Sequence, residues 1–232
     1  MIKNTVSKPE PITLIGGGVV TESDLKLALS VAPHLIAADG GANRAVAMGV
    51  TPDVLIGDLD SLTDETRALI PPDRIWEISE QDSTDFEKAL MSIHAPLIVA
   101  IGFGGARLDH QLAALHGLVR FADKHILMVL EDEVACHTPP HLTLSLDPDD
   151  TVSLFPLMPV TGTSAGLRWP IDNLTLAPGG RIGTSNAATG GPMSIRTTGP
   201  GLLTILPRRA FASLAEALVA VPAWTTHPPV HA

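Results

Sequence analysis

The first 130 residues alternate short apolar runs with segments of helical periodicity, and this alternation limits the chain to few folds. Each apolar run has the length of one buried strand, and each intervening segment repeats its apolar residues along one helix face. Such alternation predicts an α/β fold in which a parallel sheet carries helices on both faces. The expected strands are 12–16, 35–38, 54–56, 75–78, 97–101 and 126–130, and the expected helices are 22–31, 42–48, 64–69, 86–93 and 108–121.

A different pattern begins near Glu131. Short β-prone runs alternate there with clusters of Pro, Gly, Asp and Asn, which is typical of an antiparallel sandwich or barrel. We therefore expect one domain over residues 1–132 and a second over 133–232, the latter ending in an amphipathic helix at 208–219 and a frayed tail at 222–232. The expected strands of the second domain are 142–146, 152–155, 174–176, 193–197 and 202–206.

The acidic composition restricts the partners. A formal net charge of −10 repels a polyphosphate backbone, so we expect no nucleic-acid partner. An anionic ligand is then small, and a metal ion or a few Arg and Lys residues offset the repulsion.

The single cysteine, Cys136, excludes an internal disulfide and fits a reducing compartment. No apolar run approaches the roughly 20 residues that span a bilayer, and residues 1–11 lack an apolar signal core. We therefore expect a cytoplasmic protein without a membrane partner.

Polar clusters follow the expected strands at their carboxyl ends, where open α/β sheets form ligand crevices. The first is the glycine run 16–18, which either admits phosphates or a base close to the backbone or forms a plain tight turn. The second contains Asp39, Gly40, Asn43 and Arg44 at the start of a helix. Asp39 either holds a ribose hydroxyl or caps the helix, and Arg44 is placed to reach a phosphate.

The third cluster contains two carboxylates, Asp58 and Asp60. If the strand 54–56 continues through them, their side chains project from the same side. Like charges this close are unfavourable unless a cation lies between them, and oxygen ligands of this kind suit Mg²⁺. The alternative is an exposed acidic turn.

The fourth cluster spans residues 81–88. Asp82 followed by Asp85 resembles a helix capping box, worth about 1 kcal/mol. Asp85 and Lys88 also share a helix face, so a metal ligand and a phosphate-binding ammonium point the same way.

The fifth cluster, residues 102–110, again combines glycines with polar side chains after a strand. Arg107 is suited to phosphate, and Asp109 to a metal or to a hydroxyl group. We interpret His110 as a packing or capping residue at the helix start.

These motifs resemble the thiamine pyrophosphokinase family in order and spacing. The resemblance rests on residues 38–43, 57–61, 82–88, 104–110, 166–170 and 183–186, and covers about residues 14–206. It implies a Rossmann-like, nucleotide-binding catalytic domain followed by a thiamine-binding β-sandwich. It also implies a homodimer in which each active site lies between the α/β domain of one subunit and the sandwich of the other.

The same resemblance implies Mg²⁺-dependent transfer of diphosphate from ATP to the hydroxyl of thiamine, which gives thiamine diphosphate and AMP. The implied catalytic residues are Asp58, Asp60, Asp85, Lys88, Arg107 and Asp109, of which Asp58, Asp60 and Asp85 hold the metal. The implied ATP-binding residues are Gly17, Asp39, Gly40, Asn43, Arg44, Gln81 and Thr84. The implied thiamine-binding residues are Thr184, Ser185, Asn186 and Trp169, although 184–186 is also an ordinary turn sequence and a lone Trp is more often a core residue.

Two positions depart from the family pattern. Ala187 stands where many bacterial members carry an acidic residue after the Ser-Asn pair, and Ala114 stands where they carry Asn. The chain has no tyrosine, so a stacking surface for the thiamine rings must come from a small set that includes Trp169 and Phe155, or from the partner subunit.

Two other functions stay open at this point. The acidic cluster equally suits a diphosphokinase that acts on another alcohol, such as a pterin. A non-catalytic regulator that binds a nucleotide or thiamine without turnover is the alternative from another class.

Overall fold

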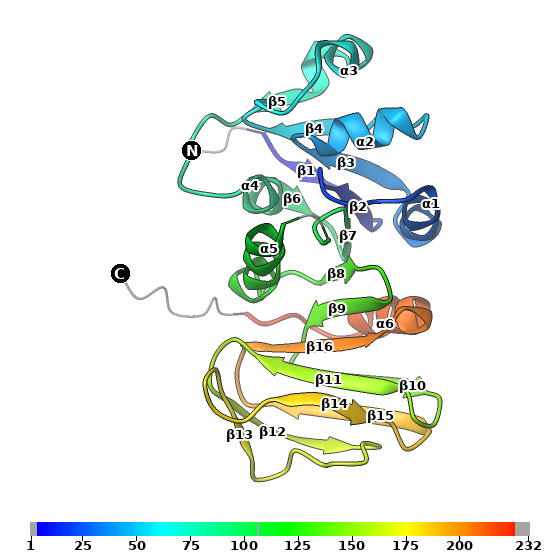
Figure 1. Cartoon of the computed structure of the whole chain (residues 1–232), viewed down its shortest axis with the longest axis vertical. Coiled ribbons are helices and arrows are strands. Elements are labelled where there is room, and N and C mark those ends of the chain that lie inside the picture. Colours follow the sequence, from blue (N-terminus) through cyan, green and yellow to red (C-terminus); the bar gives the residue numbers. More distant parts are fainter. Residues whose placement is uncertain (1–3, 106, 226–232) are drawn as a thin grey trace. The chain divides into compact units, whose positions relative to one another are not determined.

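The structure, a computed structural model, describes residues 4–105 and 107–225. Residues 226–232 of the expected tail and Ala106 of the fifth cluster lie outside the described ranges. The chain forms two compact units, Met1–Gly117 and Leu118–Ala232 (Figure 1). None of the helices within the described ranges is long and apolar enough to cross a membrane.

A five-stranded parallel sheet forms the centre of the first unit, in the order β7-β2-β3-β4-β5. Its strands are β2 (Ile12–Ile15), β3 (His34–Ala38), β4 (Val54–Gly57), β5 (Ile75–Glu77) and β7 (Ile98–Ile101). The chain runs outward from β2 through β3, β4 and β5, and then returns to pair β7 with the other edge of β2. The strand order therefore reverses between β2 and β7, and open α/β sheets bind ligands at such a reversal.

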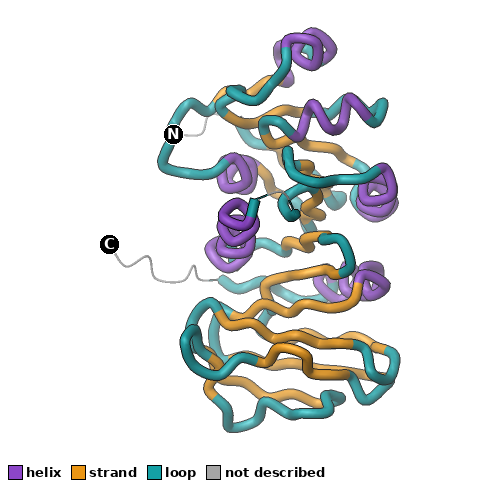
Figure 2. Tube along the Cα trace, in the orientation of Figure 1, coloured by secondary structure: helices purple, strands orange, loops and turns teal. Residues whose placement is uncertain are grey.

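Helices lie on both sides of these strands, with α1 on the right and α4 on the left in the view of Figure 2. The helices are α1 (Glu22–Val31), α2 (Gly41–Ala47), α3 (Asp64–Leu69), α4 (Asp85–Ser92) and α5 (Leu108–Arg120), with a 3-10 turn at Pro72–Arg74. Helix α1 begins where the sequence predicts, because Thr21 forms a capping box with Asp24. A short parallel pair, β1 (Val6–Ser7) with β6 (Ile93–His94), was not predicted.

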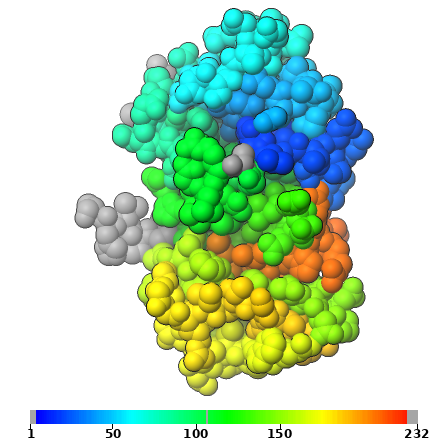
Figure 3. Space-filling model, in the orientation of Figure 1, coloured from blue at the N-terminus to red at the C-terminus, as the bar shows by residue number. Residues whose placement is uncertain are grey.

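Figure 3 shows, on one face of the molecule, the blue and cyan atoms of the N-terminal segments packed side by side. Helix α2 packs especially close to β2. A Cβ on Gly41, the first residue of α2, would lie only 2.1 Å from the carbonyl oxygen of Ile15. Only glycine permits this approach, which brings the loop after β3 to the end of β2.

The second unit consists of antiparallel strands, as the sequence predicts. Five of its strands are hydrogen-bonded side by side in the order β8 (Ile126–Val129), β9 (Glu133–His137), β16 (Leu202–Pro207), β11 (Thr151–Pro156) and β14 (Gly183–Ala187). A second sheet pairs β10 (His141–Leu146), β15 (Gly191–Thr197), β12 (Val160–Ala165) and β13 (Thr175–Leu176). In β10 the residues Leu142, Leu144 and Leu146 are buried and alternate with exposed ones, which is the pattern of a strand with one face toward a core.

The expected C-terminal helix is present but begins later. Residues Arg208–Ala210 form a 3-10 turn, and α6 (Phe211–Val219) follows and packs against β10. Strands β9, β12 and β14 were not predicted. The segment 184–186, for which an ordinary turn was one interpretation, lies within strand β14.

Candidate active site

A pocket of about 670 Å³ lies in the first unit, where β2, β3, β4 and β7 end. This volume is typical of small-molecule sites. All five polar clusters of the sequence contribute to its lining, so the carboxyl ends of the strands meet as predicted. Of the residues singled out in the sequence, Gly17, Asp39, Gly40, Asn43, Arg44, Asp58, Gln81, Thr84, Asp85, Lys88, Arg107 and His110 line it.

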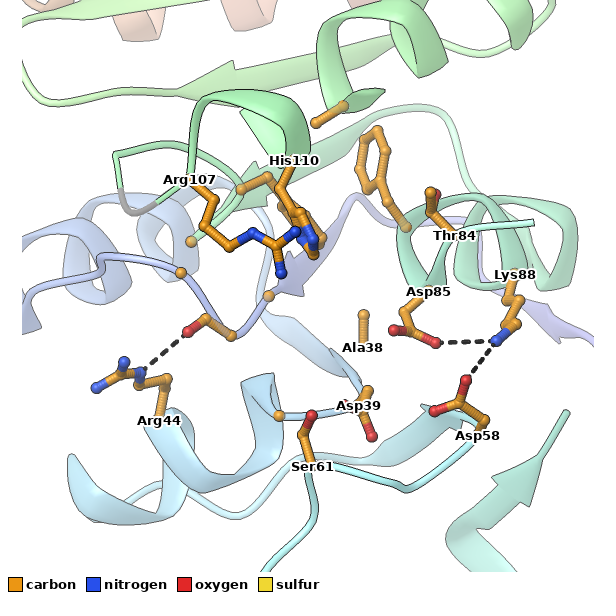
Figure 4. Close-up of a pocket in the computed structure, with 18 of the residues that line it drawn as sticks. Ala38, Asp39, Arg44, Asp58, Ser61, Thr84, Asp85, Lys88, Arg107 and His110 are labelled. Atoms are coloured by element: carbon orange, nitrogen blue, oxygen red, sulfur yellow. Dashed lines mark hydrogen bonds and ion pairs between the residues drawn. The ribbon is translucent and has the colours of Figure 1, made fainter. Parts of the chain in front are cut away.

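A buried ammonium group joins two of the carboxylates. The side chain of Lys88 is 2% exposed, and its Nζ lies 3.0 Å from Oδ2 of Asp58 and 3.2 Å from Oδ1 of Asp85. Figure 4 shows both contacts: the first joins α4 to the end of β4, and the second lies within the first turn of α4. Gln81 donates a further hydrogen bond to Oδ2 of Asp58, at 3.3 Å.

This network shifts the ionisation of its members. The hydrogen bond from Lys88 holds the pKa of Asp58 below its usual range. Burial alone would lower the pKa of Lys88, but the bonds to Asp58 and Asp85 raise it overall. Burial raises the pKa of Asp85, against the opposing effect of Lys88. The ammonium therefore stays charged, as a phosphate ligand requires.

Three carboxylates converge beside the ammonium. Asp39, Asp58 and Asp60 each offer an oxygen within 4.8 Å of the others. The route to this arrangement differs from the prediction, because β4 ends at Gly57 and does not continue through the two aspartates. A turn with Leu59 at φ 66° brings Asp60 back instead.

Asp39 is not the N-cap of α2. Gly40 occupies the cap position, and it makes no side-chain capping bond. The carboxylate of Asp39 is buried, and its Oδ1 has no hydrogen-bond partner among the described residues. Oxygen donors around a buried, unpartnered carboxylate fit a hard divalent cation such as Mg²⁺.

Backbone hydrogen bonds fix the glycine loops of β2 and β7 to each other. The N–H of Gly18 donates to the carbonyl of Gly102 at 2.8 Å, and the N–H of Val19 donates to that of Gly104 at 3.3 Å. On the other side, Nε of Arg44 donates to the carbonyl of Gly17 at 3.3 Å. The guanidinium is thereby held at the edge of the pocket (Figure 4).

Asn43 fixes the loop that carries Asp60. Its Nδ2 donates to the carbonyl of Ser61 at 2.7 Å, and its Oδ1 accepts from the N–H of Thr63 at 3.2 Å. The hydroxyl of Ser61 in turn donates to Oδ1 of Asp60. In this structure Asn43 thus positions the acidic loop.

The start of α4 is capped by a residue other than the one predicted. The capping box pairs Thr84 with Glu87, so the Asp82–Asp85 capping box is wrong. The true box places the first turn of α4, and with it Asp85, at the pocket. The free N–H groups of a helix N-terminus favour an anion nearby.

Arg107 and Asp109 form an exposed ion pair at the start of α5. The guanidinium lies 2.6 Å from Oδ2 of Asp109, and each partner holds the other in its charged form by raising or lowering its pKa. Arg107 lines the pocket, and so does His110 in the first turn of α5. His110 was interpreted as a packing or capping residue at the helix start, and it is exposed and lines the pocket.

Two phenylalanines of the pocket wall were missed by the sequence reasoning. The rings of Phe86 and Phe103 are 4.4 Å apart and tilted by 47°. Phe86 follows the helix cap and Phe103 lies inside the glycine-rich fifth cluster. Their pairing depends on two loops that meet only in the fold.

The residues expected to bind thiamine belong to the second unit. Trp169 is 57% exposed and stacks under the guanidinium of Arg168, which also pairs with Asp149. Asn186 is buried, donates to the carbonyl of Trp169 at 2.6 Å and accepts from its N–H at 3.1 Å. Asn186 therefore holds the backbone that presents the indole.

Thr184 and Ser185 lie exposed on the same strand. Ser185 adopts φ 61°, and its N–H donates to Oγ of Ser153 at 3.0 Å. The β14–β11 register shifts at this point. Phe155, on the neighbouring strand β11, is also exposed.

Comparison with known proteins supports the same assignment for both units. Residues 25–130 match the family "Thiamin pyrophosphokinase, catalytic domain", and residues 141–202 match "Thiamin pyrophosphokinase, vitamin B1 binding domain". Thiamine pyrophosphokinase 1 of Oryza sativa subsp. japonica is 29% identical over 186 residues, which is 65% of this chain and 70% of that protein. Thiamine pyrophosphokinase 1 of Arabidopsis thaliana is 27% identical over 216 residues, covering 78% and 80%.

Solved structures agree in fold. The thiamin pyrophosphokinase of Geobacillus thermodenitrificans superposes with a TM-score of 0.69 at 26% identity, and the match covers 85% of this chain and 96% of that one. The enzyme of Candida albicans gives a TM-score of 0.73 over 88% and 93%, at 16% identity. The acidic pocket lies in the first unit, and the two family matches cover residues 25–130 and 141–202. The chain therefore belongs to the thiamine pyrophosphokinase family, whose members are diphosphotransferases.

Proposed function

We propose that this chain transfers the terminal diphosphate of ATP to the hydroxyl of thiamine, with Mg²⁺ as cofactor, and releases AMP. The observation that supports this most directly is the buried Lys88 beside converging carboxylates, in a pocket at the reversal point of a parallel sheet. Such a site is suited to a nucleotide whose phosphates carry a divalent cation.

The residues of the pocket divide the work of phosphoryl transfer, which needs positioning and charge neutralisation more than covalent chemistry. Lys88 and Arg107 neutralise charge on the transferred phosphates. Arg44 binds ATP at the outer edge of the pocket. Asp58, Asp60 and Asp85 are the proposed metal ligands; bound Mg²⁺ supplies charge neutralisation at the phosphate oxygens. Gly17, Asp39, Gly40, Asn43, Gln81 and Thr84 form the rest of the proposed ATP site.

The thiamine hydroxyl attacks the β-phosphorus in line, and AMP leaves. The proton of the thiamine hydroxyl passes to a carboxylate, and the two candidates are Asp85 and Asp109. Burial raises the pKa of Asp85. Asp109 has a lowered pKa, because Arg107 binds it.

We further propose that residues 1–132 form a Rossmann-like catalytic domain, that residues 133–232 form a thiamine-binding β-sandwich, and that two chains form a dimer in the cytoplasm. Trp169, Thr184 and Ser185 are exposed in the second unit, as residues that bind a ligand must be. In this proposal they complete the active site of the partner subunit.

Product identity tests the reaction. Mass spectrometry of a mixture of the protein, Mg·ATP and thiamine should detect thiamine diphosphate and AMP in equal amounts. ADP with thiamine monophosphate would contradict diphosphate transfer. A panel of other alcohols, pterins included, then shows whether thiamine is the substrate, and binding without AMP release would indicate a regulator.

Subunit complementation tests the dimer. Asp58→Asn inactivates the α/β part, and Trp169→Ala impairs the thiamine surface, so each variant alone should be nearly inactive. When the two are mixed and exchange subunits, one site of each mixed dimer receives both intact parts, and activity returns. A mixture that stays inactive although sedimentation shows exchanged dimers would contradict the shared site.

A further inference from the structure

The indole of Trp169 carries a cation on one of its faces. The guanidinium carbon of Arg168 lies 5.5 Å from the centroid of the ring, within the roughly 6 Å of a cation–π contact. The indole is 57% exposed, although a large aromatic ring usually gains from burial. Because the guanidinium occupies one face, the opposite face is the one that a ligand can cover.

Main-chain hydrogen bonds connect the segment that carries Trp169 to the loop before β11. The N–H of Arg168 donates to the carbonyl of Ala187 at 2.8 Å. On the other side of the same short stretch, the N–H of Asp149 donates to the carbonyl of Ala188 at 3.0 Å. The backbones of Asp149 and Arg168 are therefore held at a fixed spacing, one on each side of residues 187–188.

Asp149 stands at a backbone position that favours glycine. Its φ is 67°, in the left-handed region that Asp tolerates and that glycine adopts freely. Its carboxylate forms an ion pair with the guanidinium of Arg168. The two side chains are 73% and 50% exposed, and an ion pair this exposed adds little to stability. The aspartate is therefore better explained by its effect on Arg168 than by a need of the fold.

The carboxylate of Asp149 has two effects on a ligand that covers the indole. It orients the guanidinium of Arg168 against the ring, so the ring is already ordered and the ligand does not have to order it on binding. It also neutralises the guanidinium, which would otherwise repel a cation that approaches the same ring. Thiamine carries a permanent positive charge on its thiazolium ring, so both effects favour its binding.

We propose that Asp149 and Arg168 are positioning residues of the thiamine site: together they hold the indole of Trp169 with one face open, and the carboxylate cancels the positive charge beside a cationic substrate. The inference rests on the proposed function, in which Trp169 binds thiamine, and it adds two residues to that surface. Both residues act through the indole, so their loss should raise KM for thiamine and leave kcat almost unchanged.

Steady-state kinetics of the full chain with Mg·ATP and thiamine test the effect on binding. Asp149→Asn keeps the size of the side chain and tolerates the positive φ, and Asp149→Gly removes the carboxylate without backbone strain. We expect either variant to raise KM for thiamine about two- to fivefold, with kcat and KM for ATP near the wild-type values. Asp147→Asn removes the same charge from the same loop, where the backbone of Asp147 bonds to Asp150, and it serves as the matched control.

A double-mutant cycle shows whether Asp149 acts through Arg168. In an Arg168→Met background the guanidinium is absent, so Asp149→Asn should add little further rise in KM for thiamine. An equal rise with and without Arg168 would overturn the proposal, because the carboxylate would then act on the substrate by another route.

Acrylamide quenching of tryptophan fluorescence tests the position of the indole without any substrate. The chain also contains Trp76 and Trp224, so the contribution of Trp169 is the difference between each protein and its Trp169→Phe counterpart. Release of the guanidinium in Asp149→Asn should raise the quenching constant of Trp169, and Asp147→Asn should leave it unchanged. 

An unchanged quenching constant in Asp149→Asn, or an unchanged KM for thiamine in both Asp149 variants, would overturn the proposal. A wild-type chain that forms no thiamine diphosphate would contradict the proposed function instead. The quenching measurement needs no turnover, so it still decides in that case whether Asp149 holds the indole in place.

Discussion

His137 should make the stability of the second unit depend on pH. The ring lies in β9, 6% exposed, and its Nε2 accepts a hydrogen bond from the N–H of Gly201 at 2.9 Å. Burial, with a smaller effect from His125, lowers the pKa of His137 from 6.5 to about 4. Protonation would place an N–H against the N–H of Gly201, so the folded state strongly favours the neutral ring.

The size of the effect follows from the two pKa values. Above about pH 6.5 neither state carries the proton, and the full stability is present. As the pH falls below 6.5, the unfolded chain binds a proton that the folded chain refuses, so the free energy of unfolding declines by about 1.4 kcal/mol per pH unit. The decline from this residue ends near pH 4, after a loss of roughly 3 kcal/mol.

Urea unfolding at a series of pH values measures this decline. The indole of Trp224 donates to the carbonyl of Thr138 at 3.0 Å, next to His137, so tryptophan fluorescence follows the relevant region. His137→Gln offers Gly201 an amide oxygen that does not titrate, and it should flatten the slope by about one proton between pH 6.5 and 4. His141→Gln, at the start of β10, is the matched control. Equal slopes for wild type and His137→Gln would refute the reasoning.

Further predictions concern the pocket and its supports. Lys88→Met leaves two carboxylates without their ammonium. We expect urea titration to show a loss of about 3 kcal/mol in the free energy of unfolding. Rapid quench should show that AMP forms at least about 100-fold more slowly. Gly41→Ala places a methyl group 2.1 Å from the Ile15 carbonyl and should cost about 1–3 kcal/mol, whereas Gly199→Ala meets nothing within 4 Å and should be nearly neutral in the same titration. Thr84→Ala removes the cap of α4 and should cost about 1 kcal/mol; an unchanged melting curve would contradict the capping assignment.

The parallel strands and their loops were predictable because their signal is local. Strands β2, β3, β4 and β7 are apolar except for Thr13 and His34, since parallel strands are buried on both faces, and such runs are visible in the sequence. The rule that ligands bind at the carboxyl ends of such strands then located the pocket. The rule predicted that the clusters containing Asp58, Asp85 and Lys88 lie at one edge of the sheet, and the family resemblance assigned these residues to one site.

Strands of the second unit were harder to predict because partners define them. Residues 160–165 and 183–187 are rich in Thr, Ser and Gly, and they resemble loops by composition. They are strands only because β15 and β11 supply the hydrogen bonds. Gly162, for example, lets β12 approach β15 so closely that a Cβ would meet the carbonyl of Arg196 at 2.3 Å.

The capping error at α4 has a similar origin. Asp82 with Asp85 and Thr84 with Glu87 both satisfy the three-residue spacing, so the spacing does not choose between them. The choice depends on which start buries Phe86 and Leu90 against the sheet. That is a tertiary requirement, and it also decides that Asp85 lies in the first turn of α4.

The position of Asp39 could not be predicted from local sequence patterns, because it depends on contacts between two strand ends. Its carboxylate joins Asp58 and Asp60 because φ turns positive, and φ turns positive where the end of β4 passes with a glycine at residue 57. A larger residue at 57 would push β3 and β4 apart and carry the two carboxylates away from each other. The glycine in Gly57-Asp58 thus belongs to the acidic site as much as the aspartate does, since its close approach to Asp39 sets the spacing between the carboxylates of Asp39 and Asp58.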